Sequence, residues 1–214
     1  MTMTTKIKIC GITNLEDAEF SLKCGADSLG FNFYGKSPRY IAPGAVRQII
    51  DRLPAGFEAV GVFVNEPPER VCEIAVRSGI GAIQLHGEET PGDADAIRTW
   101  SGLKIIKAFR VSAGFRAEQV LEYDVDAVLL DAYRAGEHGG TGETFDWQVA
   151  NEVKNLKPEL YLAGGLSPEN VAEAVRTVRP YAVDACSCLE KGKGVKDQQR
   201  VREFIIKCRE ADKV

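Results

Sequence analysis

The stretch Lys6-Ile-Lys-Ile-Cys10-Gly-Ile-Thr-Asn14 contains the pattern on which the fold prediction depends. Its first five residues form an apolar run of strand length, and Asn14 is a preferred N-cap residue for a helix that ends near Cys24. A similar stretch, Ala163-Gly-Gly-Leu-Ser-Pro-Glu-Asn-Val, follows a later apolar run. Shared turn chemistry explains this similarity as well as an internal repeat does. Both stretches predict a strand that turns directly into a helix.

Apolar runs of strand length alternate with amphipathic segments along the rest of the chain. In one of those segments, Val46, Ile49, Ile50 and Leu53 follow the i, i+3, i+4, i+7 spacing of one helical face. Helices that alternate with almost continuously apolar strands are typical of a parallel sheet covered by helices. The runs that predict strands are residues 6–10, 28–33, 58–64, 82–85, 104–110, 127–131, 160–163 and 181–185.

Eight strand–helix units favour a closed barrel over an open doubly wound sheet. No Gly-x-Gly-x-x-Gly motif follows the first strand, which disfavours a dinucleotide-binding fold. No Pro/Ser-rich linker or block of charge divides the chain. We therefore predict an α/β fold, a single eight-stranded parallel βα (TIM) barrel, formed by one domain over residues 1–214.

The composition of the 214 residues is typical of a soluble globular protein, with 44% hydrophobic and 27% charged residues. The net charge of −4 creates no field that favours nucleic acid or anionic lipid, so an anionic ligand needs a local binding site. The longest apolar stretches have strand length, and the N-terminus lacks the apolar core of a signal peptide. We expect no nucleic-acid partner and no membrane segment.

The chain contains six cysteines and no Cys-x-x-Cys pair. Their spread indicates reduced thiols rather than a disulfide framework. The two histidines, His86 and His138, are far apart in the sequence, which disfavours a zinc site. We therefore expect a cytoplasmic protein without a metal ion or other cofactor. The cysteines are Cys10, Cys24, Cys72, Cys186, Cys188 and Cys208.

Two residues at predicted strand ends can exchange protons. Barrel enzymes place their chemistry at the carboxyl ends of the strands, where Cys10 is followed at once by Gly11 and Asp131 ends an apolar run. A free cysteine is often a small buried hydrophobe, and a carboxylate at a strand end can cap a helix. Position alone therefore leaves a structural and a catalytic role open for both residues.

Other strand-end residues suggest where an anion binds. Gly164 and Gly165 follow the seventh predicted strand, and Ser187 and Cys188 follow the eighth. At this place in a barrel, backbone N–H groups commonly hold a phosphate. Arg39 can bind a carboxylate through two hydrogen bonds. The glycine-rich segment 132–144 is either a loop that approaches a ligand or an ordinary surface loop.

Three further side chains have weaker functional signals. His86 lies near a strand end, but a structural role is the more common one for such a histidine. Lys104 and Lys107, on the fifth predicted strand, raise a Schiff-base lyase as a rival function. A lysine at the start of a strand, however, usually extends its ammonium to solvent.

Six stretches in a fixed order carry a family resemblance: Lys8-Ile-Cys10-Gly-Ile-Thr, Ser37-Pro-Arg39-Tyr, Gln84-Leu-His-Gly, Leu129-Leu-Asp131-Ala, Gly139-Gly-Thr-Gly with Phe145-Asp-Trp147, and Leu162-Ala-Gly-Gly-Leu-Ser-Pro-Glu-Asn170. Together they resemble the phosphoribosylanthranilate isomerase family over essentially the whole chain. The resemblance implies a βα barrel of tryptophan biosynthesis that acts on a small phosphosugar, as a monomer or weak homodimer. It implies Cys10 as general base, Asp131 as general acid and Arg39 as the partner of the anthranilate carboxylate.

The eighth predicted strand departs from the family pattern. Where the family has Val-Asp-Val-Ser-Ser-Gly-Val-Glu, this chain has Val183-Asp-Ala-Cys-Ser-Cys-Leu-Glu190. Cys188 replaces a glycine, which would be costly if that position needs a positive φ or a close approach of phosphate to the backbone. A non-catalytic phosphate-binding barrel therefore stays an alternative. The related aminoimidazole-carboxamide ribotide isomerase is another, although it would lead us to expect a carboxylate in place of Cys10.

The implied reaction requires an ionised base and a protonated acid at the same time. Reference pKa values of about 8.5 for cysteine and about 3.9 for aspartate favour the opposite protonation states at neutral pH. We therefore expect nearby helix N-termini to lower the pKa of Cys10, and an apolar setting to raise the pKa of Asp131.

Overall fold

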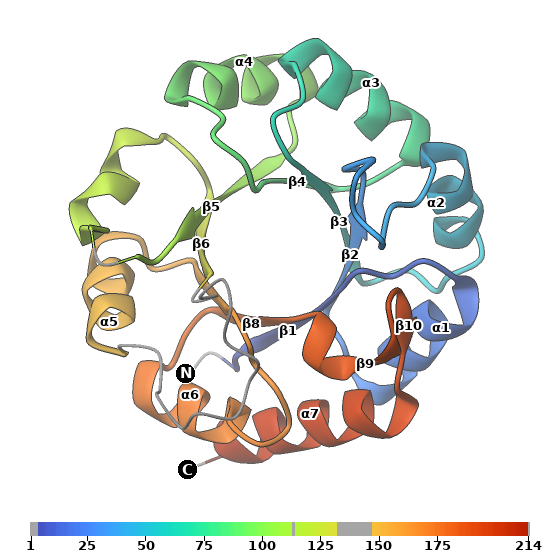
Figure 1. The fold of residues 1–214 in the computed structure, drawn as a ribbon, viewed down its shortest axis with the longest axis vertical. Helices are drawn as coiled ribbons and strands as arrows, with labels where there is room; N and C mark the ends of the chain where they lie inside the picture. Colours follow the sequence, from blue (N-terminus) through green and yellow to red (C-terminus); the bar gives the residue numbers. More distant parts are fainter. Residues whose placement is uncertain (1–3, 113, 132–146, 214) are drawn as a thin grey trace.

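The structure, a computed structural model, describes residues 4–112, 114–131 and 147–213. Eight parallel strands form a closed barrel in the order of the sequence, with β1 hydrogen-bonded to β8 (Figure 1). This confirms the predicted eight-stranded barrel. The strands are β1 (Lys6–Cys10), β2 (Ser28–Asn32), β3 (Glu58–Phe63), β4 (Ala82–Leu85), β5 (Lys104–Arg110), β6 (Ala127–Asp131), β7 (Leu160–Ala163) and β8 (Ala182–Ala185).

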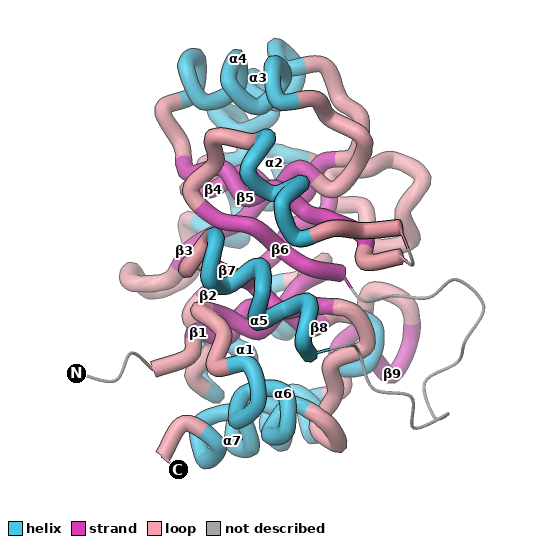
Figure 2. The backbone as a smooth tube through the Cα atoms, turned by 90° about the vertical axis from the view of Figure 1, so that its left-hand side faces the viewer, coloured by secondary structure: helices cyan, strands magenta, loops and turns pink. Residues whose placement is uncertain are grey.

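The helices surround the strands, as Figure 2 shows from the side. Within the described residues, none of them is both long and apolar enough to cross a membrane. The helices are α1 (Leu15–Cys24), α2 (Pro43–Ile50), α3 (Pro68–Ser78), α4 (Pro91–Ser101), α5 (Trp147–Leu156), α6 (Val171–Val178) and α7 (Gln198–Ala211).

The local signals used for the prediction recur in the structure, with differences at element ends. Asn14 caps α1 by accepting a hydrogen bond from the Asp17 N–H, and Gly25 ends this helix with φ 106°. The predicted helix near residue 117 is a 3₁₀ turn, η1 (Ala117–Glu122). An unpredicted hairpin, β9 (Glu190–Gly192) and β10 (Val195–Lys196), follows the short 3₁₀ turn η2 (Ser187–Leu189).

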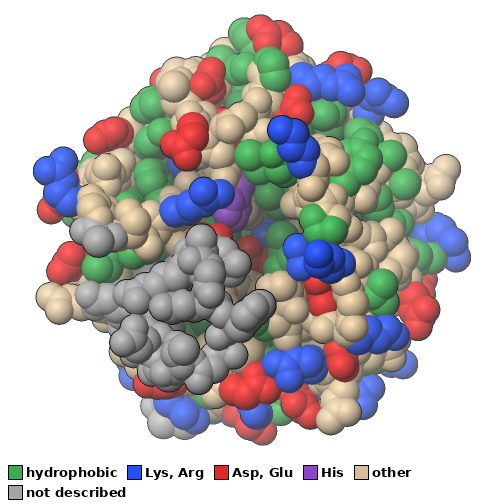
Figure 3. Space-filling model, in the orientation of Figure 1, with side chains coloured by type: hydrophobic (Ala, Val, Ile, Leu, Met, Phe, Trp, Pro, Cys, Tyr) green, Lys and Arg blue, Asp and Glu red, His purple; other side chains and the backbone are tan. Residues whose placement is uncertain are grey.

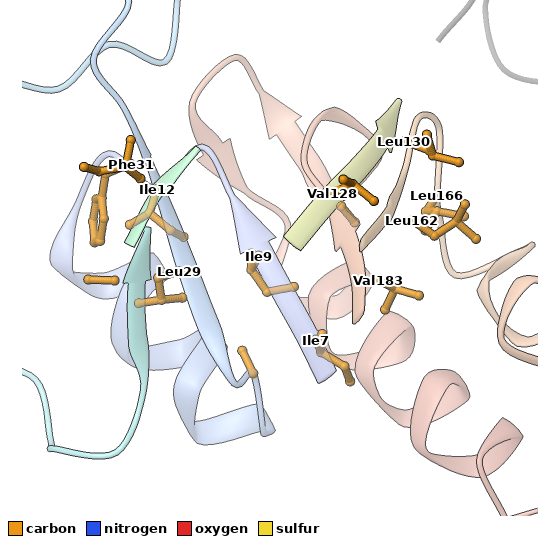
Figure 4. Packing of buried hydrophobic residues seen from close by; sticks show 14 of the residues in the cluster. Ile7, Ile9, Ile12, Leu29, Phe31, Val128, Leu130, Leu162, Leu166 and Val183 are labelled. Carbon is orange, nitrogen blue, oxygen red and sulfur yellow. The ribbon is translucent and has the colours of Figure 1, made fainter. Parts of the chain in front are cut away.

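Successive residues of each strand face opposite sides of the barrel wall. In β6, Val128 and Leu130 pack outward against the helices, whereas Ala127 and Leu129 belong to a separate cluster on the other face. Figure 4 shows the outward packing, to which Ile7 and Ile9 of β1 also contribute. The two faces explain why the strands are almost continuously apolar, and they leave alternate positions such as Lys8, Cys10 and Asp131 for the barrel interior.

Candidate active site

A cavity of about 230 Å³ lies at the carboxyl ends of the strands. Figure 3 shows this face of the molecule, with a hollow at its centre and basic side chains close to the rim. All of the site residues predicted from the sequence lie in the cavity wall: Cys10, Arg39, Asp131, Gly164, Gly165, Ser187 and Cys188. The segment 132–144 lies outside the described residues.

Cys10 is the last residue of β1 and is only 9% exposed. A hydrogen bond with Cys186 lowers the pKa of the Cys10 thiol well below its usual range. Burial opposes this shift, and the charges of Lys8 and Lys196 add to it. The pKa of Cys10 is therefore lowered, as we predicted, but the causes are a thiol and two lysines rather than helix N-termini.

Lys8, two residues before Cys10 on β1, forms a buried ion pair with Asp184 inside the barrel. Lys8 Nζ donates a hydrogen bond of 2.9 Å to Asp184 Oδ2, and Lys8 pairs with Asp184 across β1 and β8. Burial raises the pKa of Asp184 to about 6 against the opposing charge of Lys8. Within the described part of the chain, its other oxygen, Oδ1, has no hydrogen-bond partner. Because Asp184 lines the cavity, this oxygen is suited to accept a hydrogen bond from a ligand.

Asp131 ends β6 and points into the same cavity. Its Oδ2 lies 3.2 Å from Nε2 of His86, whose Nδ1 lies 2.7 Å from the side-chain amide nitrogen of Gln84. That amide nitrogen is a donor, so Nδ1 accepts and Nε2 carries the proton that faces Asp131. The sequence favoured a structural role for His86, yet His86 lines the cavity; the strand-end stretch Gln84-Leu-His is the signal that could have indicated this.

Arg39, which we predicted to bind the substrate carboxylate, is hydrogen-bonded to the carboxylate of Glu190. Its Nε and Nη2 donate hydrogen bonds of 2.7 and 2.8 Å to the two oxygens of Glu190. Lys196, which is 1% exposed, also contacts Glu190, with Nζ 3.2 Å from Oε1. Burial would raise the pKa of Glu190, but the hydrogen bond from Arg39 and the charge of Lys196 lower it overall. Glu190 thus fixes one edge of the guanidinium, while the edge formed by Nη1 and Nη2 is suited to a ligand carboxylate.

Two consecutive glycines with positive φ follow β7. Gly164 and Gly165 have φ values of 88° and 75°, which only glycine adopts without strain. Both glycines line the cavity, where no side chain separates their backbone from a ligand. The Asn170 side chain holds the loop, since its Oδ1 accepts from the Ser167 N–H and its Nδ2 donates to the Gly165 carbonyl.

Cys188 causes no backbone strain at the position where the family pattern has glycine. Among the described residues, the non-glycine residues with positive φ are Asn65 and Arg179, so Cys188 adopts an ordinary conformation in η2. Arg200 supports this turn by donating a hydrogen bond of 2.6 Å to the Cys188 carbonyl. The objection that a cysteine here would need a strained, positive φ therefore loses its physical basis.

The two lysines considered for a Schiff base lie away from the cavity. Lys107 forms a buried ion pair of 2.8 Å with Glu89, and Lys104 lies at the start of β5 near Glu58, Glu159 and Tyr161. Neither lysine lines the cavity. In residues 4–112, 114–131 and 147–213, no group of three or more His, Cys, Asp or Glu side chains is arranged to bind a metal ion.

Comparisons with known proteins agree on one family. The family model described as N-(5'phosphoribosyl)anthranilate (PRA) isomerase matches residues 7–207. A relative from Trichlorobacter lovleyi named N-(5'-phosphoribosyl)anthranilate isomerase is 47% identical, over 96% of this chain and 98% of its own length.

Solved structures of the same family have the same fold. The phosphoribosyl anthranilate isomerase of Thermotoga maritima superposes with a TM-score of 0.87 at 43% identity, covering 96% of this chain and 98% of its own. A second solved structure, with a TM-score of 0.84, 41% identity and coverage of 96% and 98%, is described as a complex with reduced 1-(o-carboxyphenylamino)-1-deoxyribulose 5-phosphate.

Proposed function

Because the chain belongs to the N-(5'-phosphoribosyl)anthranilate isomerase family, we propose that its cavity performs the reaction of that family with Cys10 as general base and Asp131 as general acid. The chain is an aldose–ketose isomerase of tryptophan biosynthesis. It converts N-(5-phosphoribosyl)anthranilate to 1-(2-carboxyphenylamino)-1-deoxyribulose 5-phosphate by an Amadori rearrangement. One observation supports the proposed roles: Cys10 and Asp131 line the same cavity, although they belong to β1 and β6, with β7 and β8 between them.

The proposed reaction begins with a proton transfer from Asp131 to the furanose ring oxygen, which opens the ring to an iminium ion. The Cys10 thiolate then removes the proton from C2′, and the electron pair moves into the iminium to give an enolamine. Tautomerisation of the enolamine gives the ketone. The hydrogen bond between His86 and Asp131 orients the carboxyl group for the first step.

The ends of the substrate are matched to two groups in the cavity wall. We assign the anthranilate carboxylate to the outer edge of the Arg39 guanidinium, which Glu190 orients. We assign the phosphate to the backbone N–H groups of Gly164, Gly165, Ser187 and Cys188. A sugar hydroxyl between them can donate to Oδ1 of Asp184.

Turnover of the fluorescent anthranilate substrate, followed as loss of fluorescence, tests this proposal. We expect turnover by the purified chain and loss of turnover on Cys10→Ala or Asp131→Asn. In a crystal structure with a product analogue, we expect electron density for the phosphate at Gly164, Gly165, Ser187 and Cys188. Phosphate bound elsewhere would overturn the assignment of the phosphate site. Comparable activity with an aminoimidazole-carboxamide ribotide would indicate a broader substrate range.

We also propose a single catalytic domain over residues 1–214, a cytoplasmic location, and a monomer or weak homodimer. All six cysteines are free, as reduced cytoplasmic thiols are. A solved structure of the Thermotoga maritima relative is described as mutually generated monomers of the dimeric enzyme. Sedimentation at several protein concentrations tests the assembly state of this chain.

A further inference from the structure

We propose that Cys186 is a positioning residue for the reaction: its thiol donates a hydrogen bond to the Cys10 sulfur and holds that sulfur ready to accept the C2′ proton. Cys186 is the residue that departs from the serine of the family pattern. This inference rests on the proposed role of Cys10 as general base.

Strand register brings the two sulfurs together. Ile9 pairs with Ala185 across β1 and β8, and a cysteine follows each of them: Cys10 ends β1, and Cys186 comes directly after β8. Side chains at paired positions of parallel strands point to the same side. Both cysteines line the cavity, one beside the other at the carboxyl ends of β1 and β8.

The Cys186 sulfur lies over the turn that follows Cys10. A Cβ atom added to Gly11, which has φ +76°, would come within 2.8 Å of Cys186 Sγ and of Arg39 Cδ. The absence of a side chain at residue 11 therefore gives the Cys186 thiol the space to approach the end of β1.

A carboxylate oxygen also lies near the Cys186 thiol. Glu190 Oε1 lies 3.9 Å from Cys186 Sγ, but it already accepts from Arg39 Nε at 2.7 Å and Lys196 Nζ at 3.2 Å. These two cations satisfy and neutralise the carboxylate oxygen. A Cys10 thiolate is the acceptor that gains more from the hydrogen, because hydrogen bonds to charged acceptors are the stronger ones.

The protonation states of the two thiols agree with this direction of donation. The hydrogen bond to Cys10 raises the pKa of Cys186 well above its usual range, and burial adds to the rise. The same hydrogen bond is the main cause of the lowered pKa of Cys10. Both shifts favour the state in which Cys10 carries the thiolate and Cys186 the thiol.

The test compares Cys186→Ala, which removes the donor, with Cys186→Ser, which retains one. The pH dependence of iodoacetamide labelling is measured at the Cys10 peptide by mass spectrometry, together with the pH profile of kcat/KM. For Cys186→Ala we expect the labelling midpoint to rise by about one pH unit, the size of a modest charge-assisted hydrogen bond. Below the midpoint, kcat/KM should fall about tenfold through kcat, with KM almost unchanged.

Cys186→Ser should keep the labelling midpoint within a few tenths of a unit, and Cys24→Ser in α1 is the control for a cysteine-to-serine change outside the cavity. Cys186→Val, which fills the space of the sulfur without a donor, serves if the alanine variant does not fold. A midpoint that does not move in the alanine or valine variant overturns the inference. So does an equal shift in the serine variant, since packing alone would then explain it.

The Cys10→Ala variant tests the proposed function separately from the positioning role of Cys186. If Cys10→Ala retains near-native turnover, Cys10 is not the base and the proposed function fails. If Cys10→Ala loses turnover while the Cys186 variants keep the normal midpoint, only the positioning role of Cys186 fails.

Discussion

The ammonium of Lys8 lies 2.9 Å from a carboxylate oxygen of Asp184 inside the barrel, on paired positions of β1 and β8. Their side chains are 0% and 8% exposed, so neither charge is compensated by bulk water. Burial alone would lower the pKa of Lys8, but Asp184 and Cys10 raise it overall. The lysine therefore remains an ammonium, and its positive charge helps to lower the pKa of the Cys10 thiol.

Replacing Lys8 by Met should destabilise the protein by roughly 3–5 kcal/mol near pH 7.5, because it leaves Asp184 buried without a partner. The pKa of Asp184, about 6, lies above its unfolded value. Its contribution to stability is therefore greatest at low pH and is lost as the pH rises through about 6. Loss of Lys8 raises this pKa further and enlarges the decline.

Urea denaturation of the wild type and Lys8→Met from pH 5 to 8 measures this effect. We expect the difference in the free energy of unfolding to shrink toward pH 5. Arg70→Met is the control, since the Arg70–Glu73 pair is exposed and contributes little. A deficit that does not change with pH would mean that Asp184 is not the source of the instability.

Cys10→Ala should fold normally and lose roughly 10²–10⁴ in turnover, the usual contribution of a positioned proton-transfer group. Steady-state kinetics and thermal unfolding measure the two effects. Cys24→Ala, outside the cavity, should keep full activity. Near-native turnover of the folded Cys10 variant would remove this residue from the mechanism.

In the wild type, iodoacetamide should label Cys10 rapidly at neutral pH, because the thiolate is favoured by Cys186, Lys8 and Lys196. A bound product analogue should block the reaction by covering the cavity. The labelled fraction of the Cys10 peptide is followed over time from pH 5 to 9. Labelling as slow as that of a model thiol over this range would show that Cys10 is not an activated base.

Gly165→Ala should raise KM and weaken inhibition by inorganic phosphate by roughly tenfold, or about 1.4 kcal/mol. An added Cβ meets nothing within 4 Å, but φ of +75° is strained for alanine, so the backbone N–H groups must turn away. Gly102→Ala is the matched control, with φ +65° and open space at the end of α4. We expect the two variants to lose similar stability, but only Gly165→Ala to raise KM. Equal KM values in the two variants would exclude Gly165 from the phosphate site.

Cys188→Gly should leave KM for the substrate unchanged or lower it. The ordinary backbone conformation of Cys188 shows that the turn η2 does not require glycine, so the N–H groups are already in place. Kinetics with the anthranilate substrate measure the effect. An increase in KM would indicate that the Cys188 side chain itself contributes to binding.

Local patterns in the sequence were sufficient for the architecture. Short apolar runs and helix caps such as Asn14 depend on residues within a few positions of one another, and their alternation leaves a parallel barrel as the arrangement that buries both strand faces. The same local logic identified Cys10 and Asp131, because each ends a strand whose alternation turns it inward. It failed for the hairpin of β9 and β10. These strands follow no hydrophobic period and are only three and two residues long.

The environment of the site was decided by closure of the barrel. Closure pairs β1 with β8, which places Lys8 against Asp184 across 176 positions of the chain and Arg39 against Glu190 across 151. The contact of Cys10 with Cys186 arises from the same strand pairing. No local pattern encodes the register between strands so distant in sequence, since it follows from the packing of all eight strands together. The sequence by itself therefore determined the barrel and placed Cys10 and Asp131 at its strand ends, whereas the tertiary structure decided which charges and donors adjust the chemistry of Cys10.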